Sequence, residues 1–195
     1  MGQVHREEDT VLTWRCCERG PGVQQGGHHP HVGDGLNALP PLVVVTLRPA
    51  TVEDCTQVWL WRNDEETRQA SVDSSPIPWA THERWFLDSL TSRRRRMYVI
   101  VADDQPSGVA RLDLDGDHAT VSIHLAPECR GRGLGPAALR ALADLAFGDP
   151  GLNGLLASVK AENRASLSVF RKAGFVPVSA GSTVTLTRRR PGSAG

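Results

Sequence analysis

Three glycines within five positions, Gly131, Gly133 and Gly135, restrict the fold of this 195-residue chain more than any other feature. They follow an alternating, β-rich stretch that ends at Leu125, and they precede a helical pattern over residues 135–147. Because glycine costs chain entropy on folding, such a cluster indicates backbone that closely approaches a ligand. The fold must therefore place a strand, a glycine-rich loop and the beginning of a helix in succession.

The segment Arg130–Gly135 carries groups that bind an anion. It ends at a predicted helix N-terminus, whose free N–H groups and dipole favour negative charge, and Arg130 and Arg132 add positive charge. The sequence therefore predicts a phosphate-binding loop. Gly133–Ala138 also fits the dinucleotide pattern G-x-G-x-x-A, but that pattern expects a strand directly before it in an opening βαβ unit. A Walker A loop is excluded because the sequence contains no Gly-Lys-Ser/Thr.

Hydrophobic periodicity predicts a mixed α/β domain, with a mostly antiparallel sheet flanked by helices. Residues 97–125 form a three-stranded antiparallel meander in this prediction, and His124 falls on the polar face of its last strand. The predicted strands are 42–47, 97–102, 108–115, 118–125, 155–160, 175–178 and 183–187. The predicted helices are one capped by Thr51, one over 81–90, one over 135–147, and one from its cap Asn163 to Gly174.

We expect three parts in the chain: a disordered N-terminal extension (1–41), a folded domain (42–188) and a disordered tail (189–195). The first 41 residues contain seven Gly, four Pro and four of the seven His, a composition typical of disorder. Their metal-ligating side chains fit no zinc-binding spacing, so no metal site is predicted from Cys16, Cys17, His28, His29 and His31.

Charge and composition exclude several classes of protein. The 22 Lys+Arg balance the 22 Asp+Glu, which argues against a nucleic-acid binder that relies on a basic surface. No apolar run approaches the ~18 residues of a membrane span, and the N-terminus lacks the apolar region of a secretory signal. The four cysteines form no dense disulfide framework, so we expect reduced thiols in a cytoplasmic protein.

Two linked motifs make the sequence similar to one known family. Arg130–Gly135 resembles the acetyl-CoA loop of the GNAT acetyltransferases, Q/R-x-x-G-x-G/A. Asn163–Phe175 resembles the family pattern N-x-x-(A/S)-x-x-x-Y-x-K-x-G-F. The resemblance covers about residues 45–187 and includes the order of elements. It implies a GNAT fold with splayed central strands, and an acyltransferase that uses acetyl-CoA to acetylate an amine.

The resemblance also implies where acetyl-CoA binds. Backbone amides of the loop would hold the pyrophosphate, and the backbone N–H near Leu125 would bond the thioester carbonyl and support the oxyanion. The pantetheine arm would enter between strands 118–125 and 155–160, which splay apart. The loop residues concerned are Arg130, Gly131, Arg132, Gly133, Leu134 and Gly135.

The second motif supplies the remaining contacts to the co-substrate. By the resemblance, Asn163 and Ser166 face acetyl-CoA, although Asn163 is also a good helix cap in any protein. The family often has a Tyr, thought to protonate the leaving thiolate, where this chain has Phe170. A thiol has a pKa near ~8.5, so its thiolate leaves without full protonation. The hydroxyl of Ser166 or Ser168, or a water, would replace the missing Tyr.

The N-terminal half of the domain indicates the acceptor. Trp61-Arg62-Asn63-Asp64, followed by His82-x-x-Trp85-Phe86, resembles a GNAT subgroup that acetylates the 4-amino group of UDP-linked amino-deoxy sugars in pseudaminic acid biosynthesis. Arg62 offers a fork for a carboxylate or phosphate, and Trp61 and Trp85 offer ring faces for a sugar or uracil. Structural roles compete with this interpretation, since Trp85 also suits a buried helix face and Asn63 a helix end.

The implied mechanism is direct transfer without a covalent enzyme, so the acceptor amine must first lose a proton. His124 is the candidate base because it lies beside the loop and histidine titrates near neutral pH. His82 is the alternative base, and a water chain is a third. The expected partner is a small-molecule amine, a nucleotide sugar, bound by a monomer or homodimer without nucleic acid or membrane.

Three other functions stay open on the sequence alone. The same enzyme chemistry would serve a protein N-terminal amine, an antibiotic amine or a polyamine. The Phe at position 170 favours a degenerate module that binds acetyl-CoA without turnover. The G-x-G-x-x-A pattern favours a dinucleotide-binding protein. A protein that binds acetyl-CoA and does not bind NAD would exclude this alternative.

Overall fold

The computed structural model describes residues 43–192, which belong to a compact unit formed by residues 41–195. The predicted N-terminal extension, including its Cys and His residues, lies outside the described residues. The strands are β1 Val45–Pro49, β2 Arg95–Ala102, β3 Gln105–Asp115, β4 His118–Leu125, β5 Gly154–Lys160, β6 Val176–Pro177 and β7 Thr183–Arg189. The helices are α1 Cys55–Asn63, α2 Glu65–Ala70, α3 Trp79–Thr91, α4 Leu134–Phe147 and α5 Arg164–Lys172, with 3-10 turns η1 Val52–Asp54 and η2 Pro127–Cys129.

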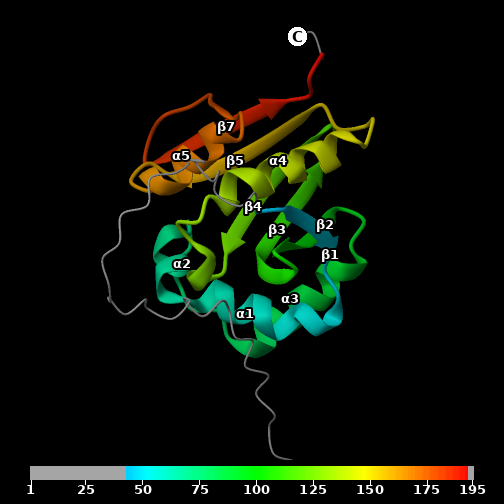
Figure 1. Ribbon diagram of the computed structural model, residues 1–195, viewed down its shortest axis with the longest axis vertical. Coiled ribbons are helices and arrows are strands. Elements are labelled where there is room, and N and C mark those ends of the chain that lie inside the picture. The colour runs from blue at the N-terminus through cyan, green and yellow to red at the C-terminus, as the bar shows by residue number, and fades with distance from the viewer. Residues whose placement is uncertain (1–42, 193–195) are drawn as a thin grey trace, which may run out of the picture. The chain divides into compact units, whose positions relative to one another are not determined.

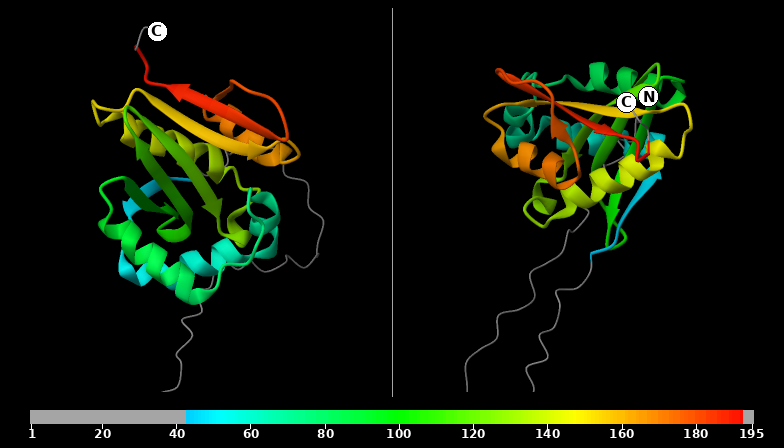
Figure 2. Two further views of the ribbon diagram at one scale, coloured as in Figure 1. Left: turned by 180° about the vertical axis from the view of Figure 1, so that it is seen from behind. Right: turned by 90° about the horizontal axis from the view of Figure 1, so that it is seen from above.

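The strands of the described chain form one seven-stranded sheet in the order β1-β2-β3-β4-β5-β7-β6. Neighbouring strands are antiparallel, except that β4 and β5 run parallel. Helices α1 and α3 lie on one side of the sheet, and α4 and α5 lie on the other (Figures 1 and 2). This arrangement confirms the predicted mixed, mostly antiparallel sheet flanked by helices.

The main hydrophobic core lies between the sheet and helices α4 and α5. Ala110, Leu112 and Val121 extend from β3 and β4 into this core, where Leu139 and Leu142 of α4 are also buried. Apolar residues recur along α4 at helical spacing, so one face of the helix covers the sheet. Burial of this face against the sheet contributes most of the stability that the domain gains from the hydrophobic effect.

The opposite face of β3 and β4 carries polar side chains, and α1 lies against these two strands. The strand register places Arg111 opposite Ser122, and Asp113 opposite Thr120. His124 lies two residues beyond Ser122 and therefore on the same face, as the alternation predicted. We call these five residues of β3 and β4 the polar face.

Strands β4 and β5 separate soon after they begin. His118–Thr120 pair with Gly154–Leu156, and residues 121–125 of β4 have no partner on β5. A Cβ at Gly154, the first residue of β5, would lie 2.6 Å from a ring carbon of His118, so a larger residue there would require the exposed His118 ring to move. The loss of β5 pairing after Thr120 confirms the predicted splaying of the central strands. We call residues 121–125 the free stretch of β4.

The helix predicted after Thr51 is divided into three pieces, η1, α1 and α2. The break between α1 and α2 falls at Asp64, whose backbone leaves the helical region with φ −53° and ψ 134°. The Asp64 carboxylate then accepts a hydrogen bond of 2.9 Å from the Thr67 backbone N–H and caps α2. A single capping side chain thus starts a new helix within a stretch whose composition is helical throughout.

The last described residues are more ordered than predicted. Strand β7 continues to Arg189, and the Arg190 side chain donates hydrogen bonds to the carbonyl groups of Phe147, Asp149 and Leu152. Folded structure therefore passes the predicted boundary at residue 188. Arg190 satisfies carbonyl groups that the end of α4 leaves free, a role that its basic sequence context did not reveal.

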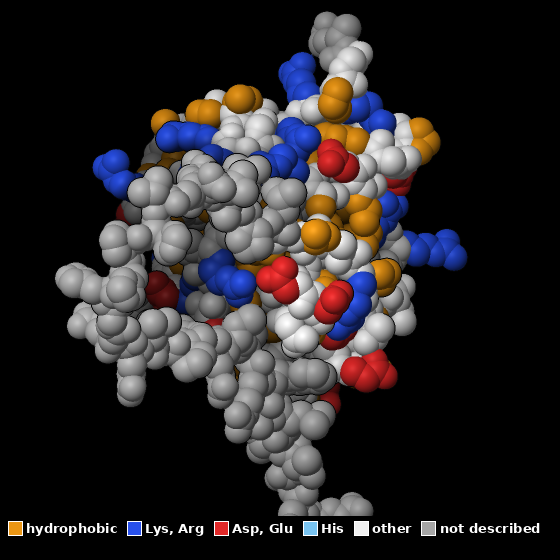
Figure 3. Space-filling model, viewed as in Figure 1, with side chains coloured by type: hydrophobic (Ala, Val, Ile, Leu, Met, Phe, Trp, Pro, Cys, Tyr) orange, Lys and Arg blue, Asp and Glu red, His pale blue; other side chains and the backbone are white. Residues whose placement is uncertain are grey.

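Acidic and basic side chains both occur on the face of the molecule shown in Figure 3. This mixture agrees with the equal numbers of acidic and basic residues in the sequence. Among the described helices, none combines the length and hydrophobicity needed to cross a membrane.

Candidate functional site

The glycine-rich loop reaches α4 through two residues in the left-handed region. Gly131 has φ 72° and Gly133, which precedes the first residue of α4, has φ 77°. A Cβ at either position would meet no atom within 4 Å, so space is open above the loop. Gly135 has a different role, because its Cβ would lie 2.8 Å from Cγ1 of Val169 on α5. The loop therefore offers backbone N–H groups at a helix N-terminus, beside open space.

The two arginines of the loop turn toward carboxylates. The Arg130 guanidinium pairs with Asp64 at 2.6 Å and with Glu66, and Arg132 lies 3.5 Å from Asp103. Hydrogen bonding to Arg130 holds the pKa of the Asp64 carboxyl below its usual range. The contribution of this loop to anion binding thus lies in its amides and the helix dipole rather than in free arginine side chains.

Helix α2 connects the two sides of the separated strands. At its beginning, Asp64, Glu66 and Thr67 bind Arg130, which follows β4. Toward its end, the Gln69 carbonyl accepts a 3.0 Å hydrogen bond from Lys160 of β5. The Ala70 carbonyl accepts one of 3.3 Å from the Asn163 side chain. Helix α2 therefore spans the divergence between β4 and β5.

His124 lies on the free stretch of β4, one residue before Leu125, and both are partly buried. Burial, followed by the positive charges of Arg62, Arg111 and Arg130, lowers the pKa of His124 to about 4. The imidazole is therefore neutral at neutral pH and able to accept a hydrogen bond. The charge of Arg130 acts on His124, and a Cβ at Gly135 would lie 3.8 Å from Cδ1 of Leu125, so both residues lie near the glycine-rich loop.

The predicted acceptor residues at the end of α1 differ in accessibility. Trp61 is 4% exposed, and its indole Nε1–H is buried without a hydrogen-bond partner among the described residues. Asn63 holds both the N–H and the carbonyl of Ile77, at 2.7 Å and 2.9 Å. Arg62 is partly buried, and its Nη2 donates to the Asp73 carbonyl at 2.9 Å. Of the three, Trp61 and Arg62 each retain a buried donor nitrogen without an acceptor among the described residues, and that of Arg62 carries the positive charge.

The predicted residues His82 and Trp85 lie on α3. His82 is 2% exposed, its Nε2 lies 3.0 Å from the Cys55 carbonyl oxygen, and its ring packs against Trp79, Trp85 and Phe86. Burial lowers the pKa of His82, so it is neutral in the core. The position suits packing rather than contact with a substrate.

Trp85 is partly buried, and two guanidinium groups lie over its ring. The distances from the ring centroid are 5.2 Å to Arg95 and 5.4 Å to Arg111. Attraction between these cations and the ring contributes roughly 0.5–2 kcal/mol each. Trp85 therefore holds arginines in place, and its ring is not a free stacking surface.

The second motif shapes the start of α5. The Asn163 side chain accepts a 2.9 Å hydrogen bond from the Ser166 N–H, which makes Asn163 the helix cap. Ser166 is partly buried one turn into α5. Phe170 is 4% exposed and packs edge-to-face on Phe175, with ring centroids 5.1 Å apart. Phe170 therefore belongs to the core, and it carries no hydroxyl that a leaving group could use.

Arg111 was not singled out from the sequence, and the structure makes it a candidate for the site. It projects from the middle of β3 onto the polar face, where its Nε donates to Asp113 at 2.8 Å. Burial lowers the pKa of the Arg111 guanidinium, although it stays charged at neutral pH. An arginine at the centre of an interior strand is the sequence signal that could have pointed to it, because burying a charge is costly unless the charge is paired and hydrogen-bonded.

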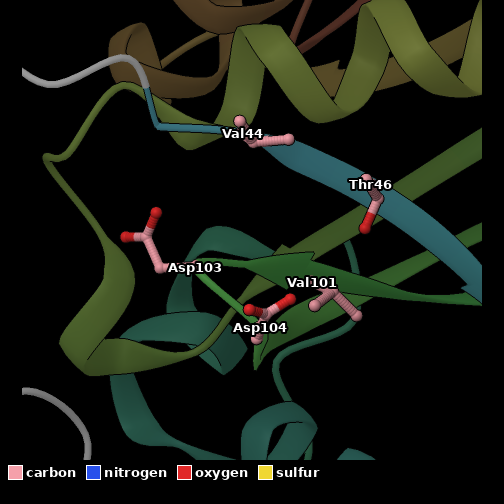
Figure 4. Close-up of a pocket in the computed structure, with 5 residues that line it drawn as sticks. All are labelled: Val44, Thr46, Val101, Asp103 and Asp104. Atoms are coloured by element: carbon pink, nitrogen blue, oxygen red, sulfur yellow. The ribbon is translucent and has the colours of Figure 1, made fainter.

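A hollow of about 380 Å³ lies between β1 and the turn that joins β2 to β3 (Figure 4). The residues that line it are Val44, Thr46, Val101, Asp103 and Asp104. This set includes no predicted site residue. The candidate site is instead the region around the free stretch of β4, where the glycine-rich loop, α2 and the polar face meet.

Solved structures of acetyltransferases share this fold. Aminoglycoside acetyltransferase AAC(6')-Ib in complex with coenzyme A matches with a TM-score of 0.66 and 22% identity, over 75% of this chain and 95% of that chain. Spermidine N-acetyltransferase from Vibrio cholerae, in complex with CoA and spermine, matches with a TM-score of 0.68 and 17% identity, over 74% and 95% of the two chains. At these identities the likeness concerns the fold.

Sequence comparison places the chain in a family. It is 28% identical, over 141 residues, to the L-methionine sulfoximine/L-methionine sulfone acetyltransferases of Pseudomonas paraeruginosa and Pseudomonas aeruginosa, which covers 67% of this chain and 79% of each relative. The model of the acetyltransferase (GNAT) domain matches residues 45–176, more than half of the chain. The order of the strands, the splayed centre of the sheet and this match together make the chain a member of the GNAT acetyltransferase family.

Proposed function

We propose that this acyltransferase moves the acetyl group of acetyl-CoA directly to the primary amine of a nucleotide-activated amino sugar, of the UDP-4-amino-4,6-dideoxy type. The free stretch of β4 is the observation that carries the proposal. It leaves backbone groups without a β5 partner, bears His124 and leads to a loop of helix-terminal amides. A thioester on a long polar arm that ends in a diphosphate requires these features in this order.

The proposed acetyl-CoA site uses the backbone more than side chains. Amides from Arg130 to Gly135 bind the pyrophosphate, since the guanidinium groups of Arg130 and Arg132 already pair with carboxylates. The N–H near Leu125 bonds the thioester carbonyl oxygen. Asn163 and Ser166 at the start of α5 lie on the β5 side of the divergence and border the arm.

In the proposed reaction the amine nitrogen bonds to the acetyl carbon while the carbon–sulfur bond breaks. The CoA thiolate leaves with the electron pair of that bond, and the amine proton passes to His124 or to water. Because its pKa is about 4, His124 is a weaker proton acceptor than the ordinary histidine that the sequence led us to expect, and water is the alternative route for the proton to solvent. The hydroxyl of Ser166 is the candidate donor to the thiolate in place of the Tyr absent at position 170.

Support for the sugar acceptor comes from the sequence resemblance over residues 61–64 and 82–86. In the structure, Arg62 and Trp85 border the polar face, whereas Trp61, Asn63 and His82 build the framework around them. A second acceptor class, the α-amine of an amino acid, is favoured by the relatives named for L-methionine sulfoximine and L-methionine sulfone. Both classes are small amines that carry an anionic group.

Release of CoA thiol tests the proposal. The protein is incubated with acetyl-CoA and each of four acceptors: a UDP-4-amino-4,6-dideoxy sugar, the free amino sugar, L-methionine sulfone and a peptide with a free N-terminus. We expect thiol release with the UDP-sugar, at a rate well above the background without acceptor. Release with L-methionine sulfone alone would replace the sugar by an amino acid and leave the reaction as proposed.

A calorimetric titration with acetyl-CoA and with NAD separates the remaining alternatives. Binding of acetyl-CoA without thiol release on any amine would identify a binding module in place of an enzyme. Binding of NAD and not of acetyl-CoA would refute the proposed use of the glycine-rich loop.

A further inference from the structure

The polar face carries one carboxylate, that of Asp113, and arginines of the neighbouring elements β2 and α1 act on its charged groups. Arg95 and Arg111 share a single carboxylate, that of Asp113, with distances of 2.6 Å and 2.8 Å. Arg62 of α1 lies near enough for its charge to act on both Arg111 and His124. Among the described residues, Arg62 forms no ion pair within 4.0 Å. Two guanidinium groups thus share the Asp113 carboxylate, and the third, that of Arg62, feels the charge of Asp73 without a direct ion pair.

Arg62 also has a donor without an acceptor. Its Nη2 binds the carbonyl oxygen of Asp73, whereas its Nη1 is buried and has no hydrogen-bond partner within the described part of the chain. A buried N–H of a charged group is normally paired, because leaving it unpaired is unfavourable. A guanidinium held by one nitrogen, with the other buried and unpaired, is expected where a ligand supplies the missing oxygen.

Arg111, on β3, is held in a fixed position on the polar face. Its Nε is bonded to Asp113 and its guanidinium lies over the Trp85 ring, so the group is oriented before any ligand arrives. The hydrogen bond found for its side chain among the described residues uses Nε, which leaves both terminal nitrogens for another acceptor. In the strand register Arg111 lies opposite Ser122, two residues from His124.

We propose that Arg62 and Arg111 together bind an anionic group of the acceptor, a carboxylate or a phosphate, beside the amine that becomes acetylated. The proposal rests on the proposed function for the identity of that amine, and it adds a charge requirement and a second binding residue. Guanidinium groups bind both anions through paired, charge-assisted hydrogen bonds. The same charges repel a polycationic acceptor, so the site selects against polyamines and aminoglycosides.

Matched acceptor pairs test the charge requirement. L-methionine sulfone is compared with its primary amide, and a UDP-4-amino-4,6-dideoxy sugar with the same amino sugar lacking the nucleotide diphosphate. For one of the pairs we expect kcat/KM to be higher for the anionic member by about tenfold or more, with the difference mainly in KM. The pair that shows the difference identifies the anion as carboxylate or phosphate. Spermidine serves as the polycationic comparison.

Two variants test the residues. Arg62→Met and Arg111→Met each keep the apolar stem and remove the charge, and each should lower kcat/KM for the anionic member much more than for the neutral member, so that most of the preference is lost. Arg84→Met, at an exposed position on α3, is the matched control and should change neither. Because Arg62 also holds the Asp73 carbonyl, circular dichroism and acetyl-CoA affinity are measured for each variant to show that the fold is kept.

Direct binding separates this proposal from the proposed function. Each acceptor is titrated by calorimetry in the presence of CoA, with the wild type and with Arg62→Met. If the wild type binds an anionic acceptor selectively and Arg62→Met loses this binding, the result supports the anion site even where no acetylation occurs. Equal binding and equal kcat/KM for both members of both pairs, or losses in the variants that affect anionic and neutral acceptors alike, would overturn it.

Discussion

The protonation of His124 links its position in the structure to the behaviour of the whole protein in acid. Burial and the charges of Arg62, Arg111 and Arg130 lower its pKa to about 4, whereas an unfolded chain leaves histidine near its ordinary value of ~6.5. Between these values the unfolded chain binds the extra proton and the folded chain does not. The contribution of His124 to the free energy of unfolding is therefore complete above about pH 6.5 and is lost as the pH falls toward 4.

His124→Gln should make the protein less sensitive to acid. The free energy of unfolding of the wild type should fall by about 2 kcal/mol more than that of the variant between about pH 7.5 and pH 5, because glutamine has no proton to take up. Urea unfolding at the two pH values measures this difference. Equal losses in the two proteins would mean that His124 titrates normally in the folded state.

His82→Ala should weaken the fold rather than the chemistry. The side chain is 2% exposed among Trp79, Trp85 and Phe86, so its removal leaves a cavity and takes away the hydrogen bond to the Cys55 carbonyl. We expect a loss of roughly 2–4 kcal/mol in the free energy of unfolding. At a temperature where the variant stays folded, KM for the acceptor should change little.

Glu83→Ala, at an exposed neighbouring position, is the control for this experiment and should leave stability unchanged. A large fall in kcat for His82→Ala without any fall in stability would restore His82 as a participant in the reaction.

Sequence patterns located the candidate site better than they assigned roles within it. The glycine cluster at 131–135 was predicted to lie between a strand and a helix, and its glycines at 131 and 133 adopt the left-handed conformation. The motif residues Trp61 and Asn63 turned out to be a buried ring and a clamp on the backbone of Ile77. A motif records which residue types occur together, whereas the direction of each side chain depends on contacts between elements distant in the chain.

At the scale of elements, the close contact between α4 and α5 depends on the absence of a side chain at Gly135. Gly135→Ala should destabilise the protein by roughly 1–3 kcal/mol, because the new Cβ would lie 2.8 Å from Cγ1 of Val169. In the background of Val169→Ala the same change should be neutral or stabilising, since alanine favours a helix over glycine. A double-mutant cycle of urea unfolding measures the coupling, and strictly additive effects would show that the helices do not meet there.

Strand positions were predicted within a few residues, whereas α2 was not recognised as a separate helix. Period-two alternation fixes a strand such as β4 locally, and its limits of 118 and 125 agree with the prediction. The break at Asp64 depends on its carboxylate, which both caps α2 and pairs with Arg130, 66 residues later in the chain. A local window of sequence contains the cap but not the distant partner.

At the scale of the molecule, residues 41–195 make a compact unit of their own. A chain that begins at residue 41 should therefore keep the Tm of the full chain within about 2 °C and bind acetyl-CoA with unchanged affinity. Differential scanning calorimetry and a CoA titration check this.

A chain that begins at residue 51 is the comparison, because it lacks β1 and leaves β2 without its antiparallel neighbour. It should unfold at a clearly lower temperature. A large loss of Tm on removal of residues 1–40 alone would show that the folded unit extends further toward the N-terminus than residue 41.

The divergence of β4 and β5 changes how many edges the sheet has. An open sheet has two, here β1 and β6, but three shared residue pairs at the centre leave β4 and β5 each with a further unpaired border. Exposed borders of this kind invite pairing with strands of other chains. These two borders face one another, and α2 and its cap bind Arg130 beyond β4 and Lys160 of β5, so both borders lie inside the domain and are shielded from strands of other chains.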